Sequence, residues 1–148
     1  MNGIPAPHAP QWFFTFLLLL PLITGRQHLG DRETDFVVRL SSVPSPRGIN
    51  ATIVTTNLYP CAGYRLRSFA TREVDTITIH INGMVRPVPC VQVGEVATGN
   101  AFLGVLTDSV YYLRVRYRGE TDLHRMSVTR RHVAITPLTT RFTRIRGY

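Results

Sequence analysis

Lysine is absent from the 148-residue sequence, so each of its 17 basic side chains is an arginine. Acids are also few, at 9 in all, which leaves a formal net charge of +8 at pH 7. An excess of this kind favours anionic partners without naming one. The chain has room for a single domain, which excludes most large enzyme scaffolds.

Long apolar runs are missing too. The longest, from Trp12 to Ile23, has 12 residues, whereas a membrane-spanning helix needs about 20. Its length is typical of the apolar part of a secretory signal. We therefore expect residues 1–25 to be a signal peptide, with cleavage near Gly25, followed by a linker over 26–34. A retained membrane anchor through residues 12–23 and an ordinary buried helix are the alternatives.

Only two cysteines occur, Cys61 and Cys90. An even pair in an exported chain predicts a disulfide, which fits a periplasmic or extracellular location. A metal or redox site would need a C-x-x-C motif or a Cys/His cluster at ligand spacing, and neither is present.

Beyond position 25, no apolar stripe at helical spacing runs for ten residues, which argues against helices. Instead, apolar and polar residues alternate along the chain, as they do in a β-strand with one buried face. This alternation places Phe36, Val38 and Leu40 on one face of a strand. Residues 74–81 form another strand, which we expect to turn at Asn82-Gly83.

A long strand over 109–118 has an inward face of aromatic and aliphatic side chains, followed by a turn over 119–122. Tyr111, opening that strand after Leu106, resembles the tyrosine corner of immunoglobulin-like domains, whose hydroxyl bonds to nearby backbone. Because short strands recur at spacings of about 8 to 12 residues, the sequence predicts an all-β domain over 35–137. The architecture we expect is an immunoglobulin-like two-sheet sandwich of seven to eight strands, with a basic C-terminal arm over 138–148.

Several segments between Tyr59 and Pro137 resemble a group of small exported bacterial immunoglobulin-like β-sandwich proteins. They are Pro60-Cys61 before Tyr64-Arg65-Leu66, TITIHINGM at 76–84, Pro87-Val88-Pro89-Cys90, AFLGVL at 101–106 and RYRGETDLHRMSVT at 116–129. The resemblance implies the fold, export and the pairing of Cys61 with Cys90. Because the group has no established activity, it transfers no catalytic residue.

Motifs for chemistry are lacking as well. The nucleophile elbow G-x-S-x-G, the P-loop, H-E-x-x-H and G-x-G-x-x-G are all absent. The five histidines are scattered, and His80 is expected on the outer face of its strand. The sequence therefore predicts no enzyme activity, no cofactor and no metal site.

The positive charge gathers in the C-terminal part of the chain. Residues 26–108 hold 8 Arg and 7 acids, while residues 109–148 hold 9 Arg and 2 acids. Arg114, Arg116 and Arg118 recur at every second position, so a strand would carry them on one side, about 6.5 to 7 Å apart. The candidate binding residues are this row together with three in the C-terminal arm, Arg141, Arg144 and Arg146.

Guanidinium groups bind carboxylate, sulfate or phosphate in bidentate fashion. These observations predict an exported, non-enzymatic binding or accessory module, whose partner is an acidic protein, an acidic glycan, a lipid headgroup or another anionic envelope surface. The simpler interpretation is that the arginines only keep a strand face solvated and guard against edge-to-edge pairing.

Two further functions stay open: a membrane-anchored structural subunit of a larger envelope complex, and a small hydrolase or protease inhibitor. Nucleic acid is disfavoured as a partner because a recognition helix, zinc finger or RNP-type motif is missing. The oligomeric state is left open.

Overall fold

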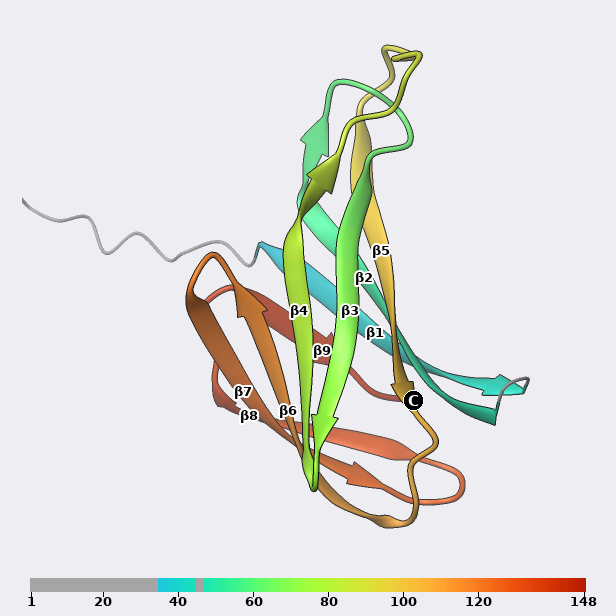
Figure 1. The fold of residues 1–148 in the computed structure, drawn as a ribbon, viewed down its shortest axis with the longest axis vertical. Coiled ribbons are helices and arrows are strands. Elements are labelled where there is room, and N and C mark those ends of the chain that lie inside the picture. Colours follow the sequence, from blue (N-terminus) through green and yellow to red (C-terminus); the bar gives the residue numbers. More distant parts are fainter. Residues whose placement is uncertain (1–34, 45–46) are drawn as a thin grey trace, which may run out of the picture.

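The computed structural model describes residues 35–44 and 47–148, and within them it contains nine strands and no helix (Figure 1). The strands, in chain order, are β1 (Phe36–Pro44), β2 (Arg47–Tyr59), β3 (Arg65–Glu73), β4 (Thr76–Val85), β5 (Glu95–Gly104), β6 (Ser109–Tyr117), β7 (Glu120–Val128), β8 (Val133–Thr139) and β9 (Thr143–Arg146). The predicted all-β class is confirmed.

The strands form one sheet in the order β8-β7-β6-β4-β3-β5-β2-β1-β9, which folds round into a sandwich-like or barrel-like body. Its two edges approach each other, since the Val133 amide at the start of β8 donates to the Tyr148 carbonyl just after β9 at 2.7 Å. Five of the eight neighbouring pairs are antiparallel, whereas the pairs β1–β9, β3–β5 and β4–β6 are parallel.

The predicted count of seven to eight strands was too low, because the short β9 went unrecognised. Its four residues, Thr143–Arg146, carry two exposed arginines and pair in parallel with β1, about a hundred residues earlier in the chain. Residues 138–148 therefore end β8 and form β9, rather than extending from the domain as a free arm.

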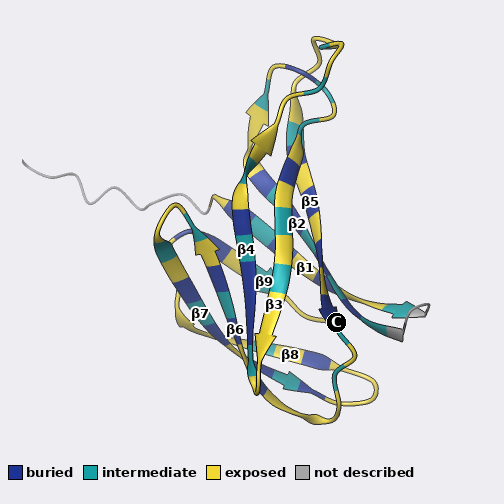
Figure 2. Ribbon diagram, in the orientation of Figure 1, coloured by how far each residue is buried: buried dark blue, intermediate teal, exposed yellow. Residues whose placement is uncertain are grey.

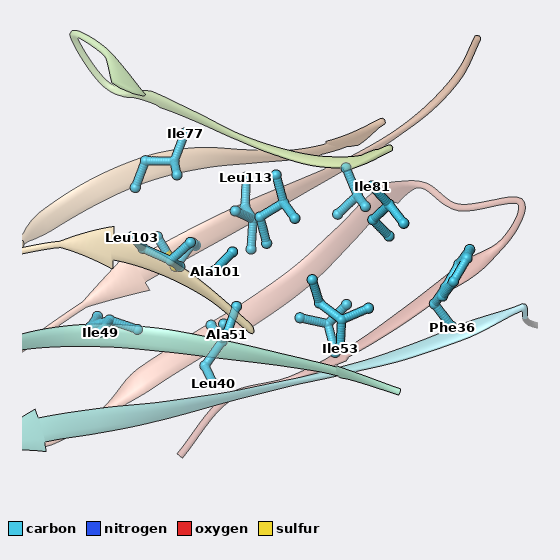
Figure 3. Close-up of a cluster of buried hydrophobic side chains, with 14 of the residues drawn as sticks. Phe36, Leu40, Ile49, Ala51, Ile53, Ile77, Ile81, Ala101, Leu103 and Leu113 are labelled. Carbon is cyan, nitrogen blue, oxygen red and sulfur yellow. The ribbon is translucent and has the colours of Figure 1, made fainter. Parts of the chain in front are cut away.

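Alternating burial along the strands builds the core, as Figure 2 shows. Phe36, Val38 and Leu40 are buried as predicted. On β6 the expected inward face is also confirmed, with Tyr111 and Leu113 buried. Figure 3 shows Ile53 of β2, Ile81 of β4 and other buried aliphatic side chains gathered between opposed parts of the sheet.

Two predicted turns lie elsewhere. Asn82-Gly83, expected to end the strand over 74–81, falls inside β4, next to a shift in its register with β3, and β4 continues to Val85. Val74 and Asp75, which were expected in that strand, form the β3–β4 connection. The β6–β7 connection uses only Arg118 and Gly119, which both have positive φ, at 48° and 83°. A two-residue turn of this handedness matches the twist of a hairpin, so β7 begins earlier than the expected turn over 119–122 allowed.

The tyrosine corner is present. The Tyr111 hydroxyl accepts a hydrogen bond from the Thr107 amide at 3.2 Å and donates to the Thr107 carbonyl at 3.3 Å. The hydroxyl thereby fixes the chain where it turns from β5 into β6.

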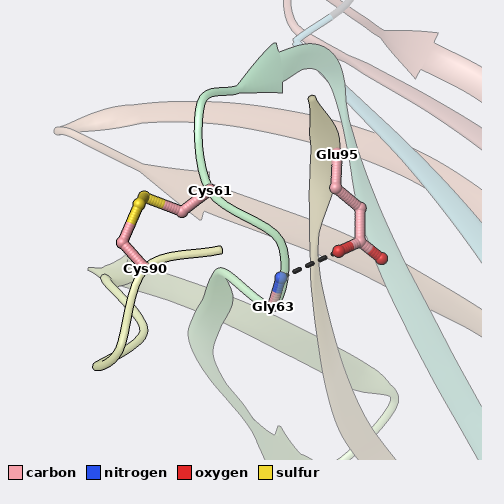
Figure 4. The surroundings of a disulfide bond; sticks show 4 residues. All are labelled: Cys61, Gly63, Cys90 and Glu95. Carbon is pink, nitrogen blue, oxygen red and sulfur yellow. Dashed lines mark hydrogen bonds between the residues drawn. A yellow bond between two sulfur atoms is a disulfide. The ribbon is translucent and has the colours of Figure 1, made fainter. Parts of the chain in front are cut away.

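The expected disulfide joins Cys61 and Cys90, whose Cα atoms are 5.2 Å apart (Figure 4). It connects the β2–β3 loop to the β4–β5 loop. Beside it, the Gly63 amide donates to Glu95 Oε2 at 2.8 Å, so two independent contacts hold the loops at this end of the sheet.

The predicted signal peptide or anchor over 1–25 and the linker over 26–34 lie outside the described residues. Within the part that is described, none of the secondary structure is a helix of the length and apolarity that a membrane crossing requires.

Gly99 tests the close approach of β5 to β3. A Cβ at this buried position would lie 2.7 Å from Leu66 Cβ and 3.0 Å from the Leu66 carbonyl oxygen. We expect Gly99→Ala to lower the free energy of unfolding by about 1–3 kcal/mol in urea denaturation, because backbone must shift.

The matched control is Gly94→Ala, whose Cβ would meet only Leu58 Cδ1, at 4.0 Å. Its effect should stay within about 0.5 kcal/mol. Equal effects of the two substitutions would contradict the packing of β5 on β3.

Candidate functional site

The outer face of β6 carries Tyr112, Arg114 and Arg116, because its alternate residues point into the core. Arg118, which the sequence placed on the same row, has left the strand. It lies in the β6–β7 turn with its guanidinium 5.0 Å from the centre of the Tyr117 ring. Two of the three predicted residues therefore share one strand face, and the third stands at its end.

The neighbouring strands extend this face. In the register of β4 with β6, His80 lies beside Arg116, and in that of β3 with β4, Phe69 lies opposite His80. The Phe69 and His80 rings stack at 4.7 Å with an interplanar angle of 10°, and Thr71 Oγ1 contacts His80 Nε2 at 3.1 Å. β7 is the other neighbour of β6 in the sheet, and its Arg125 lies opposite Tyr112.

We call this surface the basic face. It spans β3, β4, β6 and β7 and consists of Phe69, His80, Tyr112, Arg114, Arg116 and Arg125.

Within the part of the chain that the structure describes, the arginines of the basic face have no acidic partner. Among residues 35–44 and 47–148, neither Arg114 nor Arg116 forms an ion pair with an acid, whereas Arg130 approaches Asp108 at 3.8 Å. Alternate residues of a strand lie about 6.5 to 7 Å apart, so the two guanidinium groups can each bind one oxyanion of a neighbouring pair. The stacked rings beside Arg116 add an apolar, planar surface.

The three C-terminal arginines lie elsewhere. Arg144 and Arg146 are exposed on β9, opposite Val37 and Arg39 of β1, and Arg141 lies in the β8–β9 connection. β7 and β8 separate β6 from the edge where β9 approaches. The six predicted binding residues are therefore divided between two parts of the surface.

A second polar cluster is buried beneath the β8–β9 connection. The Asp122 carboxylate, 0% exposed, accepts hydrogen bonds from the amides of Arg141, Phe142 and Thr143 at 2.8, 3.1 and 2.8 Å. The Thr143 hydroxyl also donates to it at 2.6 Å. These four donors satisfy the buried charge, and they hold the chain where it enters β9.

His124 completes this cluster. Because the Thr143 hydroxyl proton is donated to Asp122, Thr143 Oγ1 accepts from His124 Nε2, 3.1 Å away. Within the described residues Nδ1 of His124 has no partner. Burial lowers the pKa of His124 below its ordinary value of 6.5, and the nearby Asp122 carboxylate opposes this shift without reversing it.

The sequence missed this cluster. Asp122 was assigned to a turn and His124 was grouped with scattered histidines, yet both fall at the buried positions of β7 that Met126 and Val128 continue. Asp122 and His124 stand at the same alternate positions as Met126 and Val128, and this pattern in the sequence could have predicted that both are buried. Within the described ranges, no three His, Cys, Asp or Glu side chains gather as metal ligands would.

Comparisons of the chain with protein-family models, curated proteins and solved structures find no match in any of the three. The resemblance to small exported bacterial sandwich proteins stays a prediction from its motifs.

Substitution of Asp122 tests its role at the β8–β9 connection. Asp122→Asn replaces an acceptor oxygen by an amide that faces backbone donors, and we expect a loss of about 3 kcal/mol or more in the free energy of unfolding. Urea denaturation measures it. Asp108→Asn, at an exposed weak pair, should cost at most about 1 kcal/mol. Similar losses for both variants would contradict a structural role for the buried carboxylate.

The lowered pKa of His124 makes stability depend on pH. In the unfolded chain His124 takes up a proton near pH 6.5, whereas in the folded chain it does so only at lower pH. The free energy of unfolding therefore falls as the pH drops below 6.5, by up to about 1.4 kcal/mol per pH unit for this group. In His124→Gln, whose amide can still donate to Thr143, this contribution should vanish. Unfolding curves between pH 6.5 and 5 measure it, and equal pH slopes for the two proteins would refute the assignment.

Proposed function

We propose that this chain is an exported, non-enzymatic binding module that holds an acidic partner on its basic face. The observation that carries the proposal is the exposure of Arg116, and partly of Arg114, on the outside of β6 without an acidic partner among the described residues. Arg116 also lies beside the stacked rings of Phe69 and His80. An arginine that serves only solubility needs no such packed aromatic neighbours, so this arrangement favours a binding role.

The shape of the site favours an extended partner. The basic face lies on the outside of the sheet along its strands, so it suits a linear chain that bears acidic groups at intervals, such as an acidic glycan or an acidic segment of a protein. The guanidinium groups would bind carboxylates or sulfates, and the rings at Phe69 and His80 would pack against the apolar side of a sugar or side chain.

Export is part of this proposal, and the Cys61–Cys90 disulfide supports it, because disulfides persist in oxidising compartments.

We also propose an immunoglobulin-like relationship for the fold. The Tyr111 corner supports this relationship. In contrast to the two sheets of an immunoglobulin-like sandwich, the nine strands here form one continuous sheet.

The test compares variants of the full chain for binding to a sulfated polysaccharide and to polyglutamate. Arg114→Ala with Arg116→Ala should weaken binding by about tenfold or more, since each residue can supply a charge-assisted hydrogen bond. Affinity should also fall steeply with salt, and less steeply in the variant.

Arg130→Ala with Arg131→Ala is the matched control, because it removes the same charge from the exposed β7–β8 connection. Its affinity should stay within about twofold of the wild type if the face, rather than net charge, recognises the partner. Equal losses in both double variants, or no loss in either, would contradict the proposal.

A further inference from the structure

The two loops joined by the disulfide form a projecting tip, which we define as residues 58–65 and 84–95. Figure 1 shows these connections, β2–β3 and β4–β5, reaching beyond the ends of the other strands. The basic face lies along the sides of the strands, so the tip is a separate surface.

Aliphatic side chains of the tip are exposed to solvent. Val88 is 93% exposed, Leu58 71%, Val91 58% and Val93 55%. Scattered single residues of this kind are normal on a protein surface, but a gathering of them marks a contact with a protein or a membrane.

The tip is held in one shape. The Cys61–Cys90 disulfide joins its loops, and the Ala62 amide donates to the Val91 carbonyl at 2.9 Å. The Gly63 amide donates to Glu95 at 2.8 Å, as Figure 4 shows. Loops fixed in this way present their apolar residues without a further ordering cost on binding.

Cationic and aromatic residues lie at the base of the tip. Arg65 begins β3 and Arg86 directly follows β4, and both are exposed. Tyr59 and Tyr64, half-buried, pack their rings 5.1 Å apart. Arginine and tyrosine below an apolar end match the layers of an anionic bilayer, where charges meet headgroups, tyrosines lie at the interface and aliphatic side chains reach the acyl region.

We propose that the tip inserts into the surface of an anionic lipid bilayer. Val88 and Val91 enter the boundary between headgroups and acyl chains, while Arg65 and Arg86 bind lipid phosphates. A bilayer presents an apolar layer and a layer of phosphates at successive depths, which matches the apolar end of the tip and the arginines at its base. This inference goes beyond the proposed function, because it uses a different surface and a different partner.

Tryptophan reporters test the proposal in the full chain. The sequence has one tryptophan, so Trp12→Phe gives a silent background, into which Val88→Trp is introduced. With vesicles of phosphatidylglycerol and phosphatidylcholine, we expect a blue shift of its emission and quenching by lipids brominated along their acyl chains. With phosphatidylcholine alone, both signals should be much weaker.

Val105→Trp is the matched control, because Val105 is 61% exposed and directly follows the end of β5 that lies farthest from the tip. It should show neither signal. Absence of quenching at Val88→Trp overturns the proposal, as does equal quenching of both reporters, which means that residues 12–23 or non-specific adsorption hold the chain at the vesicle. Equal signals with neutral and anionic vesicles overturn the role of the arginines.

A second pair of variants keeps this test separate from the proposed function. Val88→Asp with Val91→Asp should lower vesicle affinity by about tenfold or more and leave polysaccharide binding unchanged. Arg114→Ala with Arg116→Ala should do the reverse. Loss of vesicle affinity only in the second variant would overturn insertion of the tip and assign lipid binding to the basic face.

Discussion

The buried carboxylate of Asp122 is the contact on which the closure of the sheet depends. It collects three backbone amides and one hydroxyl from residues 141–143, just where the chain leaves β8 and enters β9. β9 is only four residues long and pairs with β1 alone along its length, so few of its own contacts can hold it. A charge buried without these donors would be costly, which makes the connection and the carboxylate mutually dependent.

Closure of the sheet decides what remains on the outside. With the aliphatic residues turned inward, the alternation along β6 leaves Arg116 exposed and Arg114 partly exposed. The alternation along β9 likewise leaves Arg144 and Arg146 exposed. At one end β2 with β5, and β4 with β3, run on past β1 and β6, and apolar residues of the loops there are exposed. The basic face and the exposed tip therefore follow from one packing arrangement, although they suit different partners.

Period-two alternation was sufficient to predict the all-β class, the inward face of β6 and the outward arginines. The Tyr111 corner and the Cys61–Cys90 pair were also recognisable, because each rests on residue types with few structural uses. Parallel pairing of β9 with β1 was beyond reach, since it joins distant segments without a local signal. Arg118 was misplaced because a two-residue turn with positive φ at a non-glycine residue is uncommon, and shortening that turn also placed Asp122 in β7.

Hydrogen exchange of the amides at Arg141, Phe142 and Thr143 tests whether Asp122 makes the β8–β9 connection part of the cooperative core. Amides in an exposed connection normally exchange through local fluctuations, whereas core amides require global opening. We expect these three amides to exchange with the same opening free energy as the paired amides of β6 and β7. Exchange as fast as that of the exposed β7–β8 connection would contradict it.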